Sequence, residues 1–112
     1  MPDRCKTVGT GKFGTTPVGT YPEGASPYGL LDMAGNVLEW TISLWGRDGK
    51  EPEFKYPYDP HDGRENLKAA DTVKRVVRGG DFFTPGWYAR CAYRNGFTPD
   101  FRNMLTGFRV CL

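Results

Sequence analysis

The side chains of this sequence best suited to metal or nucleophilic chemistry are three cysteines and one histidine. Cys5, Cys91 and Cys111 lack the spacing of metal ligands, and His61 lies near none of them in the chain. The pattern predicts unpaired thiols, either buried or loosely exposed. The alternative is one disulfide that joins Cys5 to a C-terminal cysteine.

A second group of side chains suits binding rather than catalysis. Residues 81–88 and 95–105 mix Phe, Trp, Tyr, Met and Leu with Thr, Pro, Gly, Asn and Asp. The aromatic residues repeat neither every two positions nor every 3.6, so they do not form one buried face. Large apolar side chains on adaptable loops are typical of contact surfaces. We therefore predict an exposed patch made of Phe83, Trp87, Tyr88, Phe97, Phe101, Met104 and Leu105. About a third of these loop aromatics are expected to be ordinary core, with Phe82 the first candidate.

Segments rich in strand-forming residues must position these loops. The clearest strand is residues 37–45, where Leu38, Trp40, Ile42 and Leu44 alternate with polar residues and are expected to face the core. Residues 73–78, 89–94 and 106–112 are predicted to be further strands, and residues 17–22 a short edge strand between two prolines. The arginines of this frame are expected to fix loops by donating to backbone carbonyls. They are Arg78, Arg90, Arg94, Arg102 and Arg109.

The rest of the chain is predicted to be irregular. Residues 1–16 are interpreted as a flexible lead-in with room for one short strand, and residues 46–73 as a long surface excursion with a helical turn at 65–70. Fifteen glycines and nine prolines among 112 residues favour a loop-rich fold, and the length favours one domain. The net charge of +2 is scattered, which argues against nucleic acid as a partner. The sequence shows no apolar run long enough to span a membrane and no signal peptide at its start.

Five motifs together resemble the C-terminal half of the formylglycine-generating-enzyme, or sulfatase-modifying-factor, family. They are PVGTYP at 17–22, YGLLDMAGNVLEWT at 28–41, RVVRGGDF at 75–82, RCAYR at 90–94 and GFRV at 107–110. The resemblance implies a C-type-lectin-like α+β fold of short twisted antiparallel sheets, long irregular loops and little helix. The enzymes of that family need a copper-holding cysteine pair between the Gly-Gly and Arg-Cys motifs. Residues 81–89 contain no cysteine, so we predict that the chain is not an enzyme.

A closer resemblance is to the variable proteins of diversity-generating retroelements, which share this lectin-like fold. In that family, miscopied adenines turn asparagine codons into codons for many residues. Most residues in the gaps of the frame are reachable in this way, whereas Trp87 and Met104 require a template codon ending in G. The resemblance implies a variable ligand-binding region at residues 81–105. Its predicted contacts are Asp81, Phe83, Thr84, Pro85, Gly86, Trp87, Tyr88, Asn95, Gly96, Phe97, Thr98, Phe101, Asn103, Met104 and Leu105.

The enzyme family also implies a calcium site. Its matching positions here are Asp32, Gly35, Val37 and Glu39, of which Asp32 and Glu39 keep the carboxylates that a hard cation takes. The alternative is an aspartate that stabilises a turn and a glutamate that pairs with an arginine.

The sequence thus predicts a non-enzymatic display protein that recognises a protein or glycan on a host or target cell. The alternative is a divergent enzyme of the formylglycine-generating type, or a part of one. Oligomerisation would compensate for weak single sites, and a virion or a cell surface is the location that fits this function.

Overall fold

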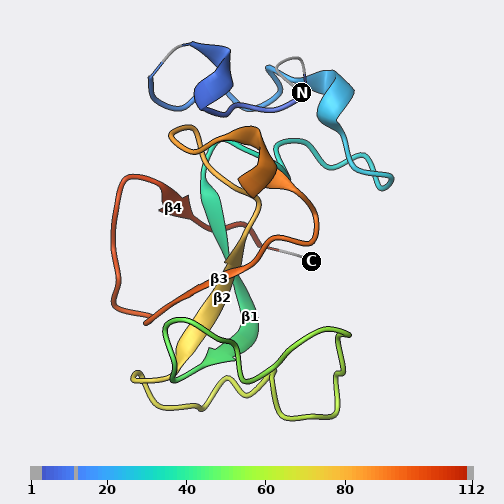
Figure 1. Cartoon of the computed structure of the whole chain (residues 1–112). Helices are drawn as coiled ribbons and strands as arrows, with labels where there is room; N and C mark the ends of the chain where they lie inside the picture. The colour runs from blue at the N-terminus through green and yellow to red at the C-terminus, as the bar shows by residue number, and fades with distance from the viewer. Residues whose placement is uncertain (1–3, 12, 111–112) are drawn as a thin grey trace.

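The part of the chain that the structure describes is built mainly from four strands and long connecting loops, shown in Figure 1. The computed structural model describes residues 4–11 and 13–110. Strands β1 (Leu38–Gly46), β2 (Lys74–Arg78), β3 (Asn95–Phe97) and β4 (Thr106–Gly107) form one sheet in the order β3-β2-β1-β4. In the described chain, helix is confined to three short 3₁₀ segments, η1 (Val8–Thr10), η2 (Pro22–Gly24) and η3 (Gly86–Ala89). The expected pattern of short strands, long loops and little helix is confirmed.

The central strand pair contains both strands that the sequence marked most clearly. β1 and β2 pair antiparallel, as does β2 with β3, whereas β4 pairs with β1 in parallel. Trp40 lies opposite Val77 and Leu44 opposite Arg75, so four steps along β1 match two along β2. This bulge breaks the alternation, and Ile42 is exposed instead of facing the core as predicted. Trp45, one position beyond the predicted face, is buried.

The core is small and includes a residue from the beginning of the chain as well as residues of the sheet and the loop after β2. Leu38, Leu44, Trp45, Val76, Val77, Phe82 and Ala89 are buried, together with Cys5. The prediction of a flexible lead-in is wrong for residues 5–7, which are all buried. The Lys6 carbonyl accepts from the Asn36 N–H at 2.8 Å, and the Val8 N–H donates to the Thr84 carbonyl at 3.2 Å. These bonds join the first residues to the segment before β1 and to the loop after β2.

Three predicted strands differ from the structure. In the predicted strand at 17–22, residues 17–20 form a turn in which the Thr20 N–H donates to the Pro17 carbonyl, and Gly19 has a φ of 90°, which a regular strand does not use. In the predicted strand at 89–94, Ala89 ends η3 and residues 90–93 form a turn, in which the side chains of Arg78 and Tyr56 donate to the carbonyls of Cys91 and Ala92. At the C-terminal end only Thr106–Gly107 is a strand. Residues 111–112 lie outside the described residues.

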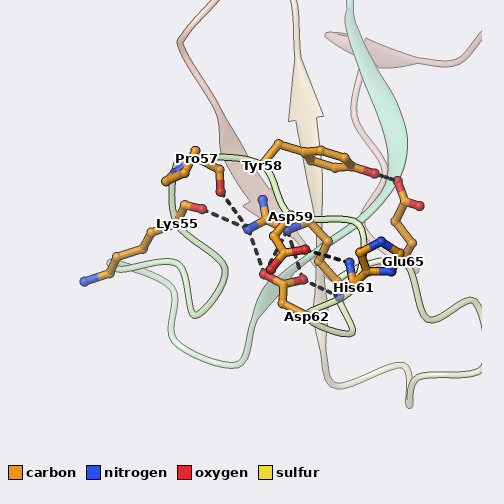
Figure 2. A network of polar contacts seen from close by, with 8 residues as sticks. Lys55, Pro57, Tyr58, Asp59, His61, Asp62 and Glu65 are labelled. Atoms are coloured by element: carbon orange, nitrogen blue, oxygen red, sulfur yellow. Dashed lines mark hydrogen bonds and ion pairs between the residues drawn. The ribbon is translucent and has the colours of Figure 1, made fainter.

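The excursion at residues 46–73 is confirmed as irregular, with turns at 66–69 and 70–73 in place of the predicted helical turn. Its organising side chain is Arg64, which is buried although no pattern in the sequence indicates this. The guanidinium donates to the carbonyls of Lys55 and Pro57 and pairs with Asp62 at 2.8 Å. In Figure 2, the dashed contacts of the Lys55 and Pro57 carbonyls and of the Asp62 carboxylate converge. In the described chain no helix is long and apolar enough to cross a membrane.

Candidate ligand-binding site

The first predicted contact loop, residues 81–88, is shaped by one buried carboxylate. Asp81 is 3% exposed, and its Oδ1 accepts the N–H groups of Phe83 and Thr84, each at 2.9 Å. The Phe82 N–H donates to the Asn36 carbonyl at 2.9 Å, and the Phe82 ring is buried. Because Phe82 faces inward, Phe83 is directed outward and remains 55% exposed. Asp81 therefore positions the loop and, being buried, is not part of its exposed surface.

The second half of this loop displays stacked aromatic rings. Trp87 lies in η3, is exposed, and stacks on Tyr88 with 3.8 Å between ring centroids. Tyr88 in turn meets Tyr93 edge to face at 4.8 Å. Burial raises the pKa of the Tyr93 hydroxyl, which keeps it a neutral donor and acceptor. The three rings support one another, so Trp87 is presented at small entropic cost.

The second contact loop, residues 95–105, begins on β3. Gly96 is buried against Trp45, and a Cβ at this position would overlap the indole ring. Gly96 is therefore a packing residue. It is buried, whereas the sequence analysis predicted that it contacts a ligand. Its neighbour Phe97 stacks on Phe101 with ring centroids 4.5 Å apart.

The far end of the second loop is tied to β1. The Leu38 N–H donates to the Leu105 carbonyl at 2.7 Å, and the Leu105 N–H donates to Asn103 Oδ1 at 3.0 Å. Met104 lies between these bonded residues and is exposed.

Residues of both loops line a small cleft. We call the exposed apolar side chains Phe83, Trp87, Phe101 and Met104 the loop surface. None of the seven apolar residues predicted for the patch is buried, since Tyr88, Phe97 and Leu105 are half-buried. The loop cleft has a volume of about 260 Å³. It is lined by Leu38, Gly80, Asp81, Thr84, Tyr88, Tyr93, Asn95, Phe97, Asn103 and Leu105.

The cleft thus brings together seven of the residues predicted to contact a ligand. Among the described residues, Thr84 Oγ1 is buried without a hydrogen-bond partner. An unpaired buried hydroxyl is costly, so it is a place where a ligand or water would bond. Of the remaining predicted contacts, Pro85 is exposed, while Gly86 and Thr98 are half-buried. Two residues at this site were not predicted from the sequence. Tyr93 lines the cleft, and the Phe13 ring packs edge-on against Phe82 and Phe83.

The frame arginines mostly behave as predicted. Arg78 and Arg90 donate to the carbonyls of Cys91 and Trp87, and Arg109 donates to those of Leu31 and Asp32. Arg94 differs, because its guanidinium lies over the rings of Tyr56 and Trp45, 4.6 and 5.8 Å from their centroids. Arg102 is exposed.

The residues matched to a calcium site fit that ion only in part. Asp32 Oδ1 is buried and has no partner among the described residues, which suits a cation ligand. Both oxygens of Glu39, however, accept from Arg109 at 2.7–2.9 Å, so the glutamate–arginine pair expected as the alternative is present. The described chain contains no group of three or more His, Cys, Asp or Glu placed to hold a metal. Calcium binding stays a prediction.

The two cysteines of the described chain are both free, Cys5 buried and Cys91 exposed. Burial raises the pKa of the Cys5 thiol and makes its reactive thiolate scarce. Because Cys5 is free, the alternative of a disulfide from Cys5 to a C-terminal cysteine is not formed in this structure. Cys111 itself lies outside the described residues.

Residues 3–112 match the sulfatase-modifying factor enzyme 1-like domain, and the chain belongs to that family. Among its relatives, serine/threonine-protein kinase pkn1 of Chlamydia caviae is 41% identical over 95 residues, which cover 85% of this chain and 14% of the kinase. The formylglycine-generating enzyme of Mus musculus is 34% identical over 99 residues, which cover 86% of this chain and 24% of the enzyme.

A solved structure agrees with this assignment. Variable protein 1 of Treponema denticola superposes with a TM-score of 0.61 and 25% identity, over 95% of this chain and 34% of that one. The C-type-lectin-like fold and the predicted resemblance to variable proteins are thereby confirmed. The chain spans between 14% and 34% of the length of these three proteins.

Proposed function

We propose that the protein is a ligand-binding display protein that recognises a protein or glycan on a cell surface through the loop surface. The observation that carries this proposal is the exposure of Phe83, Trp87, Phe101 and Met104 on two loops whose backbones are fixed by local hydrogen bonds. Exposed clusters of large apolar side chains commonly mark partner binding. The similarity to a variable protein supports the same function.

The buried and the exposed residues of the two loops have different roles, which also supports a display function. Asp81, Phe82 and Gly96 are buried beneath the loops, whereas the side chains of the loop surface are exposed. Exposed residues can therefore be exchanged at small cost in stability, and their identities would set specificity. The loop cleft is smaller than an ordinary drug-sized site and suits one inserted side chain or one sugar ring.

Absence of catalysis is part of the proposal. The enzymes named among the relatives share the fold, but residues 81–89 offer no cysteine here. Of the two thiols in the described chain, Cys5 is buried and its pKa is raised, so it is a poor nucleophile and a poor copper ligand.

A binding experiment tests the proposal. Fluorescently labelled protein would be applied to a glycan array and to an array of purified cell-surface ectodomains. We expect selective binding that falls at least about tenfold in a Trp87→Ala, Phe101→Ala double variant. The matched control is Leu67→Ala, an exposed apolar residue in the excursion at 46–73, which should bind like the wild type. Equal binding by the loop variant and the wild type would refute the role of this surface.

A further inference from the structure

Several polar groups that line the loop cleft have hydrogen-bonding capacity that the loops do not use. Thr84 Oγ1 is buried there and has no partner among the described residues. Asp81 uses Oδ1 to accept the N–H groups of Phe83 and Thr84, and no described residue donates to its Oδ2. Polar groups that are removed from water without a partner cost free energy, so a ligand that bonds them is favoured.

Two asparagines at the cleft leave their amide nitrogens unused. Asn95 Oδ1 accepts the N–H of the next residue at 2.8 Å, and Asn103 Oδ1 accepts the Leu105 N–H at 3.0 Å. These bonds identify the oxygen end of each amide, and within the described chain neither Nδ2 has an acceptor. The cleft thus offers two amide donors, a carboxylate acceptor in Asp81, and in Thr84 a hydroxyl that both donates and accepts.

The rest of the cleft is uncharged and partly apolar. Leu38, Phe97 and Leu105 contribute apolar surface, and Asp81 is the one charged side chain among the described residues that line it. A negative charge at this place disfavours an anionic occupant. Calcium takes several carboxylate and amide oxygens, whereas the oxygens of both asparagines here already accept N–H groups. The cleft therefore favours a neutral ligand that touches the side chains directly, without a metal between them.

A neutral sugar ring matches these groups better than a side chain of a protein ligand does. Each sugar hydroxyl both donates and accepts, and the C–H groups of the ring are apolar, so one ring serves the polar groups and the apolar wall together. Lysine and arginine offer no acceptor to the two amides, an amide side chain offers one oxygen, and an apolar side chain leaves every polar group unpaired. The volume of about 260 Å³ limits the occupant to about one ring.

We propose that the loop cleft binds one neutral pyranose ring of a glycan by direct contact with Asp81, Thr84, Asn95 and Asn103. The Asp81 carboxylate and the Thr84 hydroxyl accept from sugar hydroxyls, and the two amides donate to sugar oxygens. This inference rests on the proposed display function and narrows its ligand from a protein or glycan to a glycan.

Titrations with simple sugars test the assignment. The probes are the methyl pyranosides of glucose, galactose, mannose, N-acetylglucosamine and N-acetylgalactosamine, added in EDTA to the isotopically labelled 112-residue chain and followed by NMR of its backbone amides. We expect at least one probe to bind with a dissociation constant of roughly 1 mM and to shift the resonances of residues 81–84, 95–97 and 103–105. The methyl glucuronoside, which adds a carboxylate to the ring, should bind more weakly.

Variants that keep the shape of the cleft separate recognition from folding. Thr84→Val removes the unpaired hydroxyl, so it should weaken sugar binding about fivefold without lowering the melting temperature. Asp81→Asn keeps the oxygen that accepts two N–H groups but removes the charge, so it should reduce the difference in affinity between the glucoside and the glucuronoside. The matched control is Thr16→Val, because Thr16 Oγ1 is also buried and unpaired within the described chain but does not line the cleft. This control should bind the sugar like the wild type.

The outcomes distinguish this inference from the display function on which it rests. Absence of binding by every sugar would overturn it, as would binding that ignores Thr84→Val or that requires calcium. If the sugars fail while an ectodomain is bound through Trp87 and Phe101, the display function stands and its ligand is a protein. If a sugar binds the cleft while the Trp87 and Phe101 changes leave array binding unaffected, the inference stands and the role of the loop surface is refuted.

Discussion

Replacement of Arg109, which lies near the C-terminal end, by alanine is expected to lower the free energy of unfolding. The Arg109 guanidinium donates to both Glu39 oxygens and to the carbonyls of Leu31 and Asp32. It thus joins the segment after β4 to β1 and to the turn before β1. Removal leaves the Glu39 carboxylate, whose side chain is 18% exposed, without its counter-ion.

The magnitude follows from this partial burial. An exposed pair contributes less than about 1 kcal/mol, whereas breaking a fully buried pair costs about 3–5 kcal/mol. The Arg109 side chain is 35% exposed, so an intermediate loss of about 2–3 kcal/mol is expected once the two carbonyl bonds are included. For a chain of this length that loss lowers the melting temperature by about 10 °C.

Urea unfolding and thermal melts would measure the effect. Arg109→Lys should recover part of the loss, because an ammonium keeps the charge but cannot reach all four acceptors. Arg102→Ala, at an exposed frame arginine, is the matched control and should change stability by less than about 0.5 kcal/mol. If Arg109→Ala and Arg102→Ala were equally stable, the bonds of Arg109 would not support the fold as argued.

Three further predictions follow from single groups. Iodoacetamide should modify Cys91 in the folded chain and spare Cys5, because burial raises the Cys5 pKa; peptide mapping that shows equal labelling would contradict the buried position. The hydrogen bond from Arg64 holds the pKa of Asp62 below 3.8, so the pair stabilises the fold at neutral pH and its contribution is lost as the pH falls through the lowered value. Asp62→Asn should therefore melt earlier than the wild type at neutral pH, and the difference should vanish well below pH 3.8; a gap that persists there would point to packing instead. Millimolar calcium should raise the melting temperature of the wild type but not of Asp32→Ala. Identical melting temperatures of the wild type in calcium and in EDTA would show that this site does not bind calcium.

The sequence allowed β1, β2 and the exposed aromatic residues to be predicted, because these depend on alternation and composition. The burial of Asp81 and Gly96 was not predictable in the same way. Asp81 is fixed by N–H groups that its own turn presents, and Gly96 by the Trp45 ring, which is distant in sequence. Both positions lie in a region whose composition is typical of exposed loops.

Other differences also arise from contacts between distant residues. A bulge in β1 exposed Ile42, which the simple alternation placed in the core. In the sequence, Arg64 resembles the many exposed charged residues around it. It is buried because carbonyls of its own loop converge on its guanidinium, which only the structure shows. Residues 5–7 have a polar composition typical of a flexible terminus, yet they pack against the segment before β1.

We propose that residues 81–105 contain exposed positions whose side chains can be exchanged, held on a support of buried residues that cannot. A library that randomises Phe83, Trp87, Phe101 and Met104 tests it most directly when compared with a library that randomises Asp81, Phe82 and Gly96. Folded, protease-resistant members would be counted by surface display and sequencing. Most members of the first library are expected to fold, and binders to unrelated protein targets should be selectable from it, whereas few members of the second library should fold. Equal folding fractions in the two libraries, or a first library that rarely folds, would contradict it.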